Sequence, residues 1–351
     1  MSDYPFVSIL LPIYNEISTI DRCLQAVLNQ TYPPDRVEIL VADGGSDDGT
    51  CQKLDALADQ HPRLRIMHNP GRIVSKALNL LTNQARGEVI IRVDGHCVIA
   101  PDYVANCVRR LAQEQVDVVG GPMRSIGETE TTVGISIATS SKFGVGYSAF
   151  RVETGKSMLV DTVPFPACTR AMIARVGLYD EELVRDQDDE LNYRIRKAGG
   201  KVFLADEVRS DYYSRSSLKS LWKQYFEYGV WKVRVMQKHP QQMRPRQFVP
   251  FAFVMAIILG MTLSLVTSWG WQALLGLLGV YALANLTASL LTAWKKGWAY
   301  LMLLPIAFVT LHLSYGIGFL VGLVRFWNRW GDQVGNVPEL DKGFDEFATD
   351  R

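Results

Sequence analysis

Two long stretches of this sequence carry no charged side chain, and they limit the possible folds more than any other feature. Neither Phe248–Trp294 nor Tyr300–Val324 contains an Asp, Glu, Lys or Arg residue. About 20 consecutive apolar residues in a helix cross a bilayer core, and the first stretch is long enough for two such helices with a break near Ser268–Trp271. The sequence therefore predicts about three transmembrane helices within residues 248–324, followed by a polar tail, residues 325–351.

A basic, aromatic segment comes directly before the first apolar stretch. From Arg215 to Arg246 there are eight Lys or Arg residues against one acidic residue, Glu227. Such segments are typical of helices that lie on an anionic membrane surface, so residues 215–247 are predicted to be interfacial. Because positive residues favour the cytoplasm, the N-terminal part is predicted to be cytosolic. Arg325 and Arg329 do not fit three crossings, which leaves a re-entrant segment as an alternative.

Residues 1–214 carry most of the charge and alternate between strand-like and helix-like segments. Strands are predicted at 6–11, 37–42, 64–68, 88–93 and 116–121, and helices at 18–30, 50–59, 73–85, 101–113, 169–176 and 188–198. Residues 127–157 lack clear periodicity and are predicted to be a long loop. The alternation predicts a doubly wound α/β sheet, whose ligands bind beyond the carboxyl ends of the strands.

Acidic side chains follow two of the predicted strands. Asp43 ends the second strand, and Asp94-Gly-His96 ends the fourth. Asp47 and Asp48 come next to a predicted helix start, where capping is the simpler explanation. Asp43 lies several residues earlier, where a carboxylate can accept hydrogen bonds from a nucleobase or a ribose. Asp94 and His96 are two possible ligands of a divalent metal ion, Mg²⁺ or Mn²⁺.

A third acidic cluster, Asp186–Glu190, comes at the predicted start of a helix. Acidic residues there complement the helix dipole, and this explanation suffices for Asp186 and Asp189. Clustered carboxylates also repel one another, which raises at least one pKa and makes a general base plausible.

These motifs, in this order, resemble family 2 glycosyltransferases of the GT-A fold. The resemblance rests on four segments over roughly residues 5–230: Pro12-Ile-Tyr-Asn-Glu16, Val41-Ala-Asp-Gly-Gly-Ser-Asp-Asp-Gly-Thr50, the acidic strand end at Asp94, and the acidic cluster before Arg194–Gly199. Asn69–Asn79, the Asp-Gly-His and the Gln-Asp-Asp-Glu are similar to the branch of succinoglycan-type exopolysaccharide glucosyltransferases.

The resemblance implies a role for each matching residue. Pro12, Tyr14 and Glu16 would line the nucleoside pocket with Asp43, and Asp94 would hold the metal that bridges the donor diphosphate. Asp188 would be the catalytic base. Two further expectations are that Arg72 and Lys76 meet phosphate, and that His96 joins Asp94 at the metal although the family usually has a second Asp there. Gln187 replaces the Glu of the family's Glu-Asp pair.

The expected reaction is an inverting transfer from a nucleotide-sugar, with a UDP-sugar as the expected donor. The expected acceptor is a polyprenyl-diphosphate-linked or other lipid, in exopolysaccharide or cell-envelope glycan synthesis. The sequence has no signal peptide, and its five cysteines, an odd number without metal-ligand spacing, are expected to be reduced thiols of a cytosolic compartment. The chain is therefore expected to be a multi-pass protein of the bacterial inner membrane with a cytosolic catalytic domain. A net charge of +1 argues against nucleic acid as a partner.

Two alternatives remain open from the sequence. A processive polysaccharide synthase would carry Gln-x-x-Arg-Trp on an interfacial helix, whereas Gln224 is followed here by Glu227 and Tyr228. A non-catalytic membrane protein that keeps a nucleotide-sugar pocket would explain the departures at His96 and Gln187, although Asp43, Asp94 and Asp188 would then have no chemical role.

Overall fold

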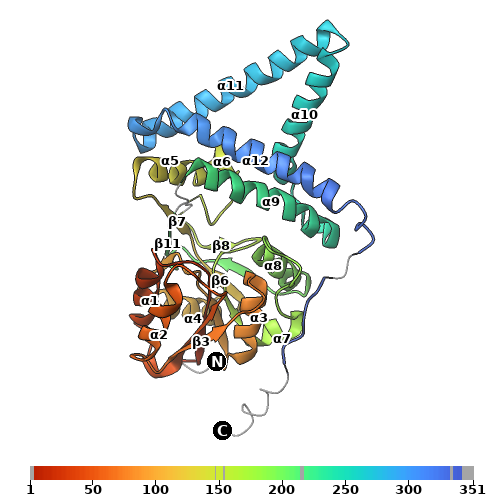
Figure 1. Cartoon of the computed structure of the whole chain (residues 1–351). Helices are drawn as coiled ribbons and strands as arrows, with labels where there is room; N and C mark the ends of the chain where they lie inside the picture. The colour runs from red at the N-terminus through yellow and green to blue at the C-terminus, as the bar shows by residue number, and fades with distance from the viewer. Residues whose placement is uncertain (1–3, 147, 153–154, 214–216, 333–334, 342–351) are drawn as a thin grey trace. The chain divides into compact units, whose positions relative to one another are not determined.

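The computed structural model describes residues 4–146, 148–152, 155–213, 217–332 and 335–341 (Figure 1). The chain forms two compact units. The first comprises the residues up to 124, residues 153–212 and the C-terminal stretch from Gly335, and the second comprises residues 125–152 and 213–334. This division differs from the expected one in two places, because residues 125–152 belong with the second unit and the part of the tail from Gly335 to Asp341 belongs with the first.

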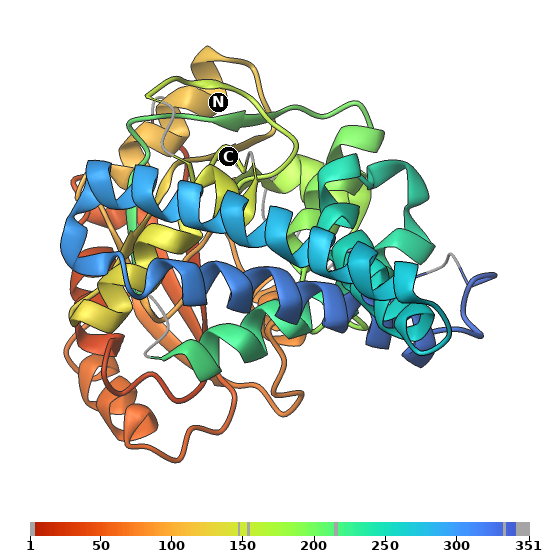
Figure 2. The same cartoon turned by 90° about the horizontal axis from the view of Figure 1, so that it is seen from above.

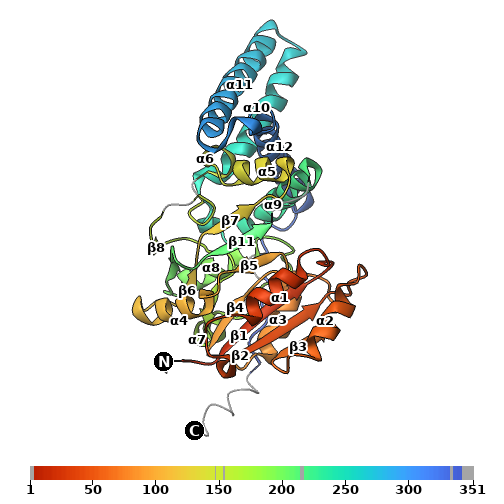
Figure 3. The ribbon, with the colours of Figure 1, turned by 90° about the vertical axis from the view of Figure 1, so that its left-hand side faces the viewer.

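Four parallel strands form the half of the main sheet that carries the candidate site (Figure 3). They are β1 (Val7–Ile13), β2 (Val37–Asp43), β3 (Leu64–His68) and β4 (Val89–Arg92), in the order β3-β2-β1-β4. Every residue of β2 is buried, as expected for a central parallel strand that is covered on both faces. The register pairs Ile13 with Asp43 and Asp43 with His68, so the ends of three strands meet.

The other half of the sheet continues in the order β9-β6-β10-β8. Its strands are β6 (Val118–Gly120), β8 (Met158–Leu159), β9 (Ala167–Thr169) and β10 (Val202–Leu204). β9 runs antiparallel to both of its neighbours, β4 and β6. A second, three-stranded sheet contains β5 (Cys97–Ile99), β7 (Met123–Ile126) and β11 (Ser210–Tyr213). The predicted doubly wound, mixed α/β sheet is therefore confirmed.

The helices of the first unit form because their apolar residues recur on one face. In α1 (Ile20–Leu28), the buried positions Ile20, Cys23, Leu24 and Val27 follow helical spacing. The other helices are α2 (Thr50–Ala58), α3 (Val74–Gln84), α4 (Tyr103–Gln113), α7 (Arg170–Val176) and α8 (Gln187–Lys197). The predicted helix bounds agree within two residues at each end.

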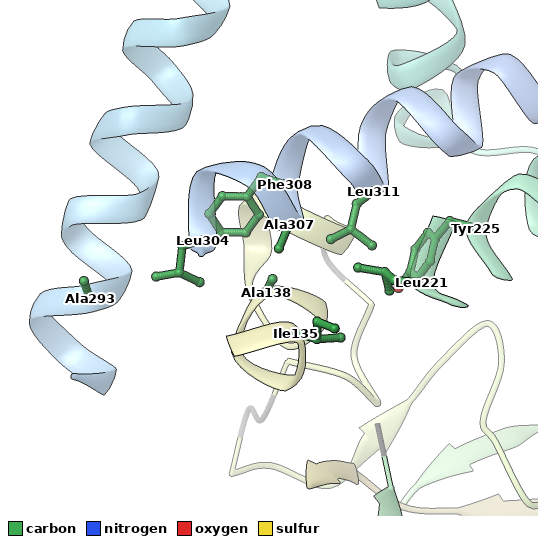
Figure 4. Packing of buried hydrophobic residues seen from close by; sticks show 9 residues of the cluster. All are labelled: Ile135, Ala138, Leu221, Tyr225, Ala293, Leu304, Ala307, Phe308 and Leu311. Carbon is green, nitrogen blue, oxygen red and sulfur yellow. The ribbon is translucent and has the colours of Figure 1, made fainter. Parts of the chain in front are cut away.

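The second unit is helical throughout its longer elements. It contains α5 (Glu130–Thr139), α6 (Lys142–Val145), α9 (Leu218–Lys238), α10 (Val249–Ser264), α11 (Ser268–Lys296) and α12 (Leu304–Arg325). The loop predicted for residues 127–157 is wrong, because α5 and α6 lie within it. A capping box between Thr129 and Thr132 begins α5. Its apolar residues then pack against α9 and α12 rather than following one regular stripe (Figure 4).

Among the residues that the structure describes, three helices are long and apolar enough to cross a membrane: Pro245–Ser264, Ser268–Lys296 and Leu304–Arg325. α10 and α11 form a hairpin (Figures 1 and 3). α12 runs beside α9, as the view from above also shows (Figure 2). The three apolar helices are not equivalent, because half of the most apolar stretch of α12 is buried in protein, against 11% and 17% for α10 and α11.

Candidate active site

The loop after β2 is built on the side chain of Asp43. This residue is 4% exposed, and its carboxylate accepts hydrogen bonds from the backbone N–H groups of Gly45 (3.0 Å) and Ser46 (3.1 Å) and from the Ser46 hydroxyl (2.6 Å). Gly45 has φ +79°, which the tight turn requires. Asp43 therefore first holds its own loop, and a nucleobase or ribose would use the lone pairs that these bonds leave.

The loop after β1 is joined to the start of α2 by polar side chains. Asn15 donates from its backbone to the Ser46 hydroxyl (2.9 Å) and from its amide to Asp47 (2.8 Å). Asp48 accepts from the backbone of Ile17 (3.1 Å) and of Thr50 (3.0 Å). Asp47 and Asp48 thus hold these loops together, but neither caps the helix as expected, because the N-cap of α2 is Gly49 and has no side-chain cap.

An exposed ring and an exposed guanidinium flank the Asp43 loop. Tyr14 is 49% exposed, and its ring lies 3.3 Å from where a Cβ on Gly44 would be. The Arg72 guanidinium lies 3.6 Å from the equivalent point on Gly45. Pro12 is half-buried near the end of β1, whereas Lys76 rests its aliphatic chain against Gly71. Tyr14 and Arg72 therefore provide a stacking surface and a positive charge beside Asp43.

Glu16 and His96 form a pair between the ends of β1 and β4. Glu16 Oε1 lies 2.7 Å from His96 Nδ1, and the imidazole ring contacts Tyr212 edge-on with centroids 4.9 Å apart. Gly95 permits this approach, because a Cβ there would lie 2.6 Å from Ile13 Cδ1 and 3.0 Å from Glu16 Cγ. A carboxylate that holds one imidazole nitrogen directs the other, Nε2, outward as a possible metal ligand.

Arg92 links the other two carboxylates of the site. It is buried at the end of β4, and its guanidinium donates to both oxygens of Asp94 (2.7 and 3.1 Å) and forms an ion pair with Asp188. Asp188 lies in the first turn of α8, and its side chain remains 25% exposed. One planar cation thus holds the predicted metal ligand and the predicted base in fixed positions.

The surroundings of these two carboxylates move their pKa values in opposite directions. Burial raises the pKa of Asp188 to about 6, against the attraction of Arg92 and with the repulsion of Asp94. Burial also disfavours ionisation of Asp94, but the attraction of the Arg92 guanidinium, with a smaller effect of the neighbouring His96, outweighs it and lowers the pKa of Asp94. Two neighbouring carboxylates whose pKa values differ in this way can have different chemical roles. Asp94 stays ionised, whereas Asp188 can take up a proton near neutral pH.

The chain by itself supplies few metal ligands. Among the residues that the structure describes, no three His, Cys, Asp or Glu side chains are arranged to hold an ion. Each Asp94 oxygen accepts one N–H from Arg92 and keeps a further lone pair, and His96 Nε2 points away from Glu16. These groups fit a cation that is completed by the phosphates of a bound donor, as is common for Mg²⁺ sites.

The structure brings the predicted site residues into two groups. Tyr14, Asp43 and Arg72 lie at the loop after β2, and Glu16, Asp94, His96 and Asp188 lie around the end of β4. Pro12 pairs with Ala42 just before that loop, and Lys76 packs against Gly71, outside both groups. Glu16, which was expected in the nucleoside pocket, contacts His96 through its carboxylate, and its backbone N–H donates to the Thr50 hydroxyl at the start of α2 (3.0 Å). Two neighbours were missed, Arg92 and Tyr212. A lone arginine after Val89-Ile-Ile in a buried strand was a signal for the first, whereas Tyr212 comes from a distant strand.

Comparison with known proteins shows the family to which the chain belongs. The sequence model of the family described as Glycosyl transferase family 2 matches residues 8–180. The succinoglycan biosynthesis protein ExoA of Rhizobium meliloti is 32% identical over 92% of this chain and 96% of its own length. A Methanococcus voltae transferase, named a dolichyl N-acetyl-alpha-D-glucosaminyl phosphate 3-beta-D-2,3-diacetamido-2,3-dideoxy-beta-D-glucuronosyltransferase, is 28% identical over 91% and 98% of the two chains.

Among solved structures, the fold is similar to that of a mannosyltransferase from Pyrobaculum calidifontis, in complex with GDP-Man and Mn²⁺. The TM-score is 0.58 at 20% identity, over 90% of this chain and 87% of that one. The fold and the acidic site therefore define a glycosyltransferase with the GT-A architecture. The chain belongs to glycosyl transferase family 2, in which it is similar to the succinoglycan-type protein.

Proposed function

We propose that this glycosyltransferase moves a sugar from a nucleotide-sugar to an acceptor hydroxyl with inversion, and that Asp188 is its base. The observation that carries the proposal is that one guanidinium, that of Arg92, contacts both Asp94 and Asp188. In these surroundings the pKa of Asp94 is lowered and the pKa of Asp188 is raised. A carboxylate with a pKa of about 6 is ionised at neutral pH and can still accept a proton.

In the proposed step, the acceptor oxygen attacks the anomeric carbon, its proton passes to Asp188, and the bond from that carbon to the nucleoside diphosphate breaks. A divalent ion held by Asp94 and His96 would offset charge on the leaving diphosphate. Arg92 keeps Asp188 in position while leaving part of its carboxylate exposed to the acceptor. Glu16 orients His96 through Nδ1.

The donor is proposed to be a UDP-sugar. Tyr14 offers a face on which a base can stack, and the loop held by Asp43 lies beside it. Arg72 flanks the same loop and is the proposed diphosphate contact, with Lys76 as a second cation on α3. Mn²⁺ or Mg²⁺ is the proposed cofactor, in line with a histidine and a carboxylate as ligands.

The acceptor is proposed to be a lipid-linked glycan, polyprenyl-diphosphate-linked in the simplest case, in exopolysaccharide or cell-envelope synthesis. The apolar helices support this, since a water-soluble acceptor needs no membrane. The names of the two relatives refer to succinoglycan and to a dolichyl phosphate. We propose a multi-pass protein of the bacterial inner membrane with its catalytic unit in the cytosol, on the side that the basic segment before α10 favours.

The test is transfer by the detergent-purified enzyme, with UDP-, GDP- and dTDP-sugars crossed with Mg²⁺ and Mn²⁺ and a polyprenyl-diphosphate glycan as acceptor. Asp188→Asn should abolish transfer while donor binding is kept, and Asp189→Asn, one residue further along α8, should keep most of the activity. Full activity in Asp188→Asn would refute the base assignment. Equal use of soluble sugars would refute the lipid acceptor, and long polymers as products would favour the processive alternative.

A further inference from the structure

The C-terminal tail is part of the fold of the catalytic unit. The described stretch Gly335–Asp341 follows the last apolar helix in sequence, yet it belongs to the first unit. It lies along the loop that leads from α7 to the acidic cluster. Among the described residues, four hydrogen bonds hold it: Leu178 N–H to Pro338 O (2.9 Å), Glu181 N–H to Asn336 O (2.8 Å), Asn336 N–H to the fully buried Asp180 carboxylate (3.1 Å) and Asp341 N–H to Asn83 Oδ1 (3.3 Å).

This attachment restricts how often the chain can cross a membrane. A segment that is hydrogen-bonded into the catalytic unit lies on the same side of the bilayer as that unit. The polypeptide leaves the first unit near Tyr212 and returns to it at Gly335. The number of complete crossings between these points must therefore be even, and three apolar helices cannot all cross.

α12 is the helix whose packing excludes a crossing. It runs parallel to α9, because residues later in α12 contact residues later in α9. A Cβ on Gly322 would lie 2.6 Å from Val230 O, and the end of the pair is held by Gln237 Nε2–H to Phe326 O (2.7 Å). Gly318 meets Phe226 in the same close manner one turn earlier. Helices that share glycine contacts over this length share one direction in the membrane.

α9 cannot take a transmembrane direction. Its 21 residues include Lys223, Glu227, Lys232, Arg234 and Lys238. A single Lys or Arg at the centre of a spanning helix costs about 2.5 to 3.5 kcal/mol on insertion scales. Because α9 must stay near the surface, α12 must lie near the surface beside it.

The other two apolar helices, α10 and α11, are largely uncovered by protein. α10 and α11 are covered by protein over only small parts of their surfaces, and the turn between them exposes Leu265 (85%), Val266 (76%) and Trp269 (78%). α12 exposes a narrower apolar face, with Ile306 54% and Val324 67% exposed. Helices that are apolar all round and uncovered need lipid on all sides, whereas a half-covered one needs lipid on one side.

We propose that the chain crosses the bilayer twice, through the α10–α11 hairpin, and that the α9–α12 pair lies in the membrane interface with the free face of α12 against lipid. The tail then returns on the catalytic side and braces the loop before Asp188. This arrangement places Lys295, Lys296, Arg325 and Arg329 on one side, as the distribution of positive residues favours.

The test is the sidedness of single cysteines in intact cells that express the full chain. The background is Cys51→Ser, since the other four cysteines are buried. Val266→Cys lies in the hairpin turn and Asp341→Cys at the described end of the tail, and both positions are exposed. A membrane-impermeant maleimide should label one of the two in intact cells and both after permeabilisation.

The comparison of the two sites does not depend on which side the catalytic unit faces. Three crossings, or none, would place both cysteines on the same side, and equal labelling in intact cells would overturn the proposal. Lys296→Cys is a matched probe that should behave as Asp341→Cys does. The readout requires no donor or acceptor, so it stands apart from the transfer assay. A thermal denaturation midpoint equal to that of the Cys51→Ser background shows that each variant is folded.

Discussion

Replacing Arg92 with Gln should move the acidic limb of the pH–activity profile to higher pH. The proposed base acts when it is ionised, so activity is lost as the pH falls through the pKa of Asp188, which is about 6. Arg92 contacts Asp188 directly and lowers that pKa against the effects of burial and of Asp94. Without the guanidinium, two carboxylates remain close together in a partly buried site, and protonation of Asp188 becomes easier.

The size of the effect follows from the contact. A neighbouring arginine lowers a carboxyl pKa by about 1 to 3 units, so its removal should place the Asp188 pKa at roughly 7 to 9. For an increase of about two units, the ionised fraction at pH 7 falls from about nine-tenths to about one-tenth, and kcat/KM falls about tenfold. The loss should be recovered at alkaline pH, which distinguishes it from simple damage to the site.

The assay is kcat/KM for the nucleotide-sugar over a broad pH range, which reports groups of the free enzyme. Arg92→Lys keeps a positive charge and should leave the limb near its wild-type position. Arg110→Gln is the matched control, because Arg110 pairs with Glu207 and Glu114 outside the site. An acidic limb at the same pH in Arg92→Gln, with only a lower plateau, would show that Asp188 is not the group that titrates.

Three further perturbations test other parts of the site. Glu16→Gln should weaken Mn²⁺ activation about 10- to 100-fold by releasing the imidazole it orients, and an unchanged metal titration would contradict this. Gly95→Ala should lower the free energy of unfolding by about 1 to 3 kcal/mol, because the new Cβ would crowd Ile13 and Glu16. Thermal denaturation of the variant and of the wild type measures this difference. Glu190→Gln should lower the free energy of unfolding by about 3 to 5 kcal/mol, because it breaks a buried ion pair with Arg194. A loss below about 1 kcal/mol in urea unfolding would refute this prediction.

The sequence determined the class of fold and the identity of the main acids. Alternating apolar strands and amphipathic helices follow from local periodicity, so β1 to β4 and the helices between them could be predicted closely. The positions of Asp43 and Asp94 at strand ends follow from the same pattern. The apolar stretches were equally clear, because their length and lack of charge are properties of the sequence alone.

Tertiary structure decided what these residues contact. Arg92 joins Asp94 to Asp188, which lies far away in sequence, and the Glu16 carboxylate contacts the His96 imidazole. α5 and α6 formed where no stripe of apolar residues was visible, because they pack against other helices on several sides.

The number of membrane crossings also could not be predicted from the hydropathy of the sequence. Composition cannot distinguish a helix surrounded by lipid from one that lies against a charged neighbour. Three helices of the described part of the chain are each long and apolar enough to cross a membrane. The hydrogen bonds from Gly335–Asp341 back to the catalytic unit, and the packing of α12 on α9, are contacts between residues distant in sequence. Such contacts depend on the path of the whole chain, and only the folded structure contains that information.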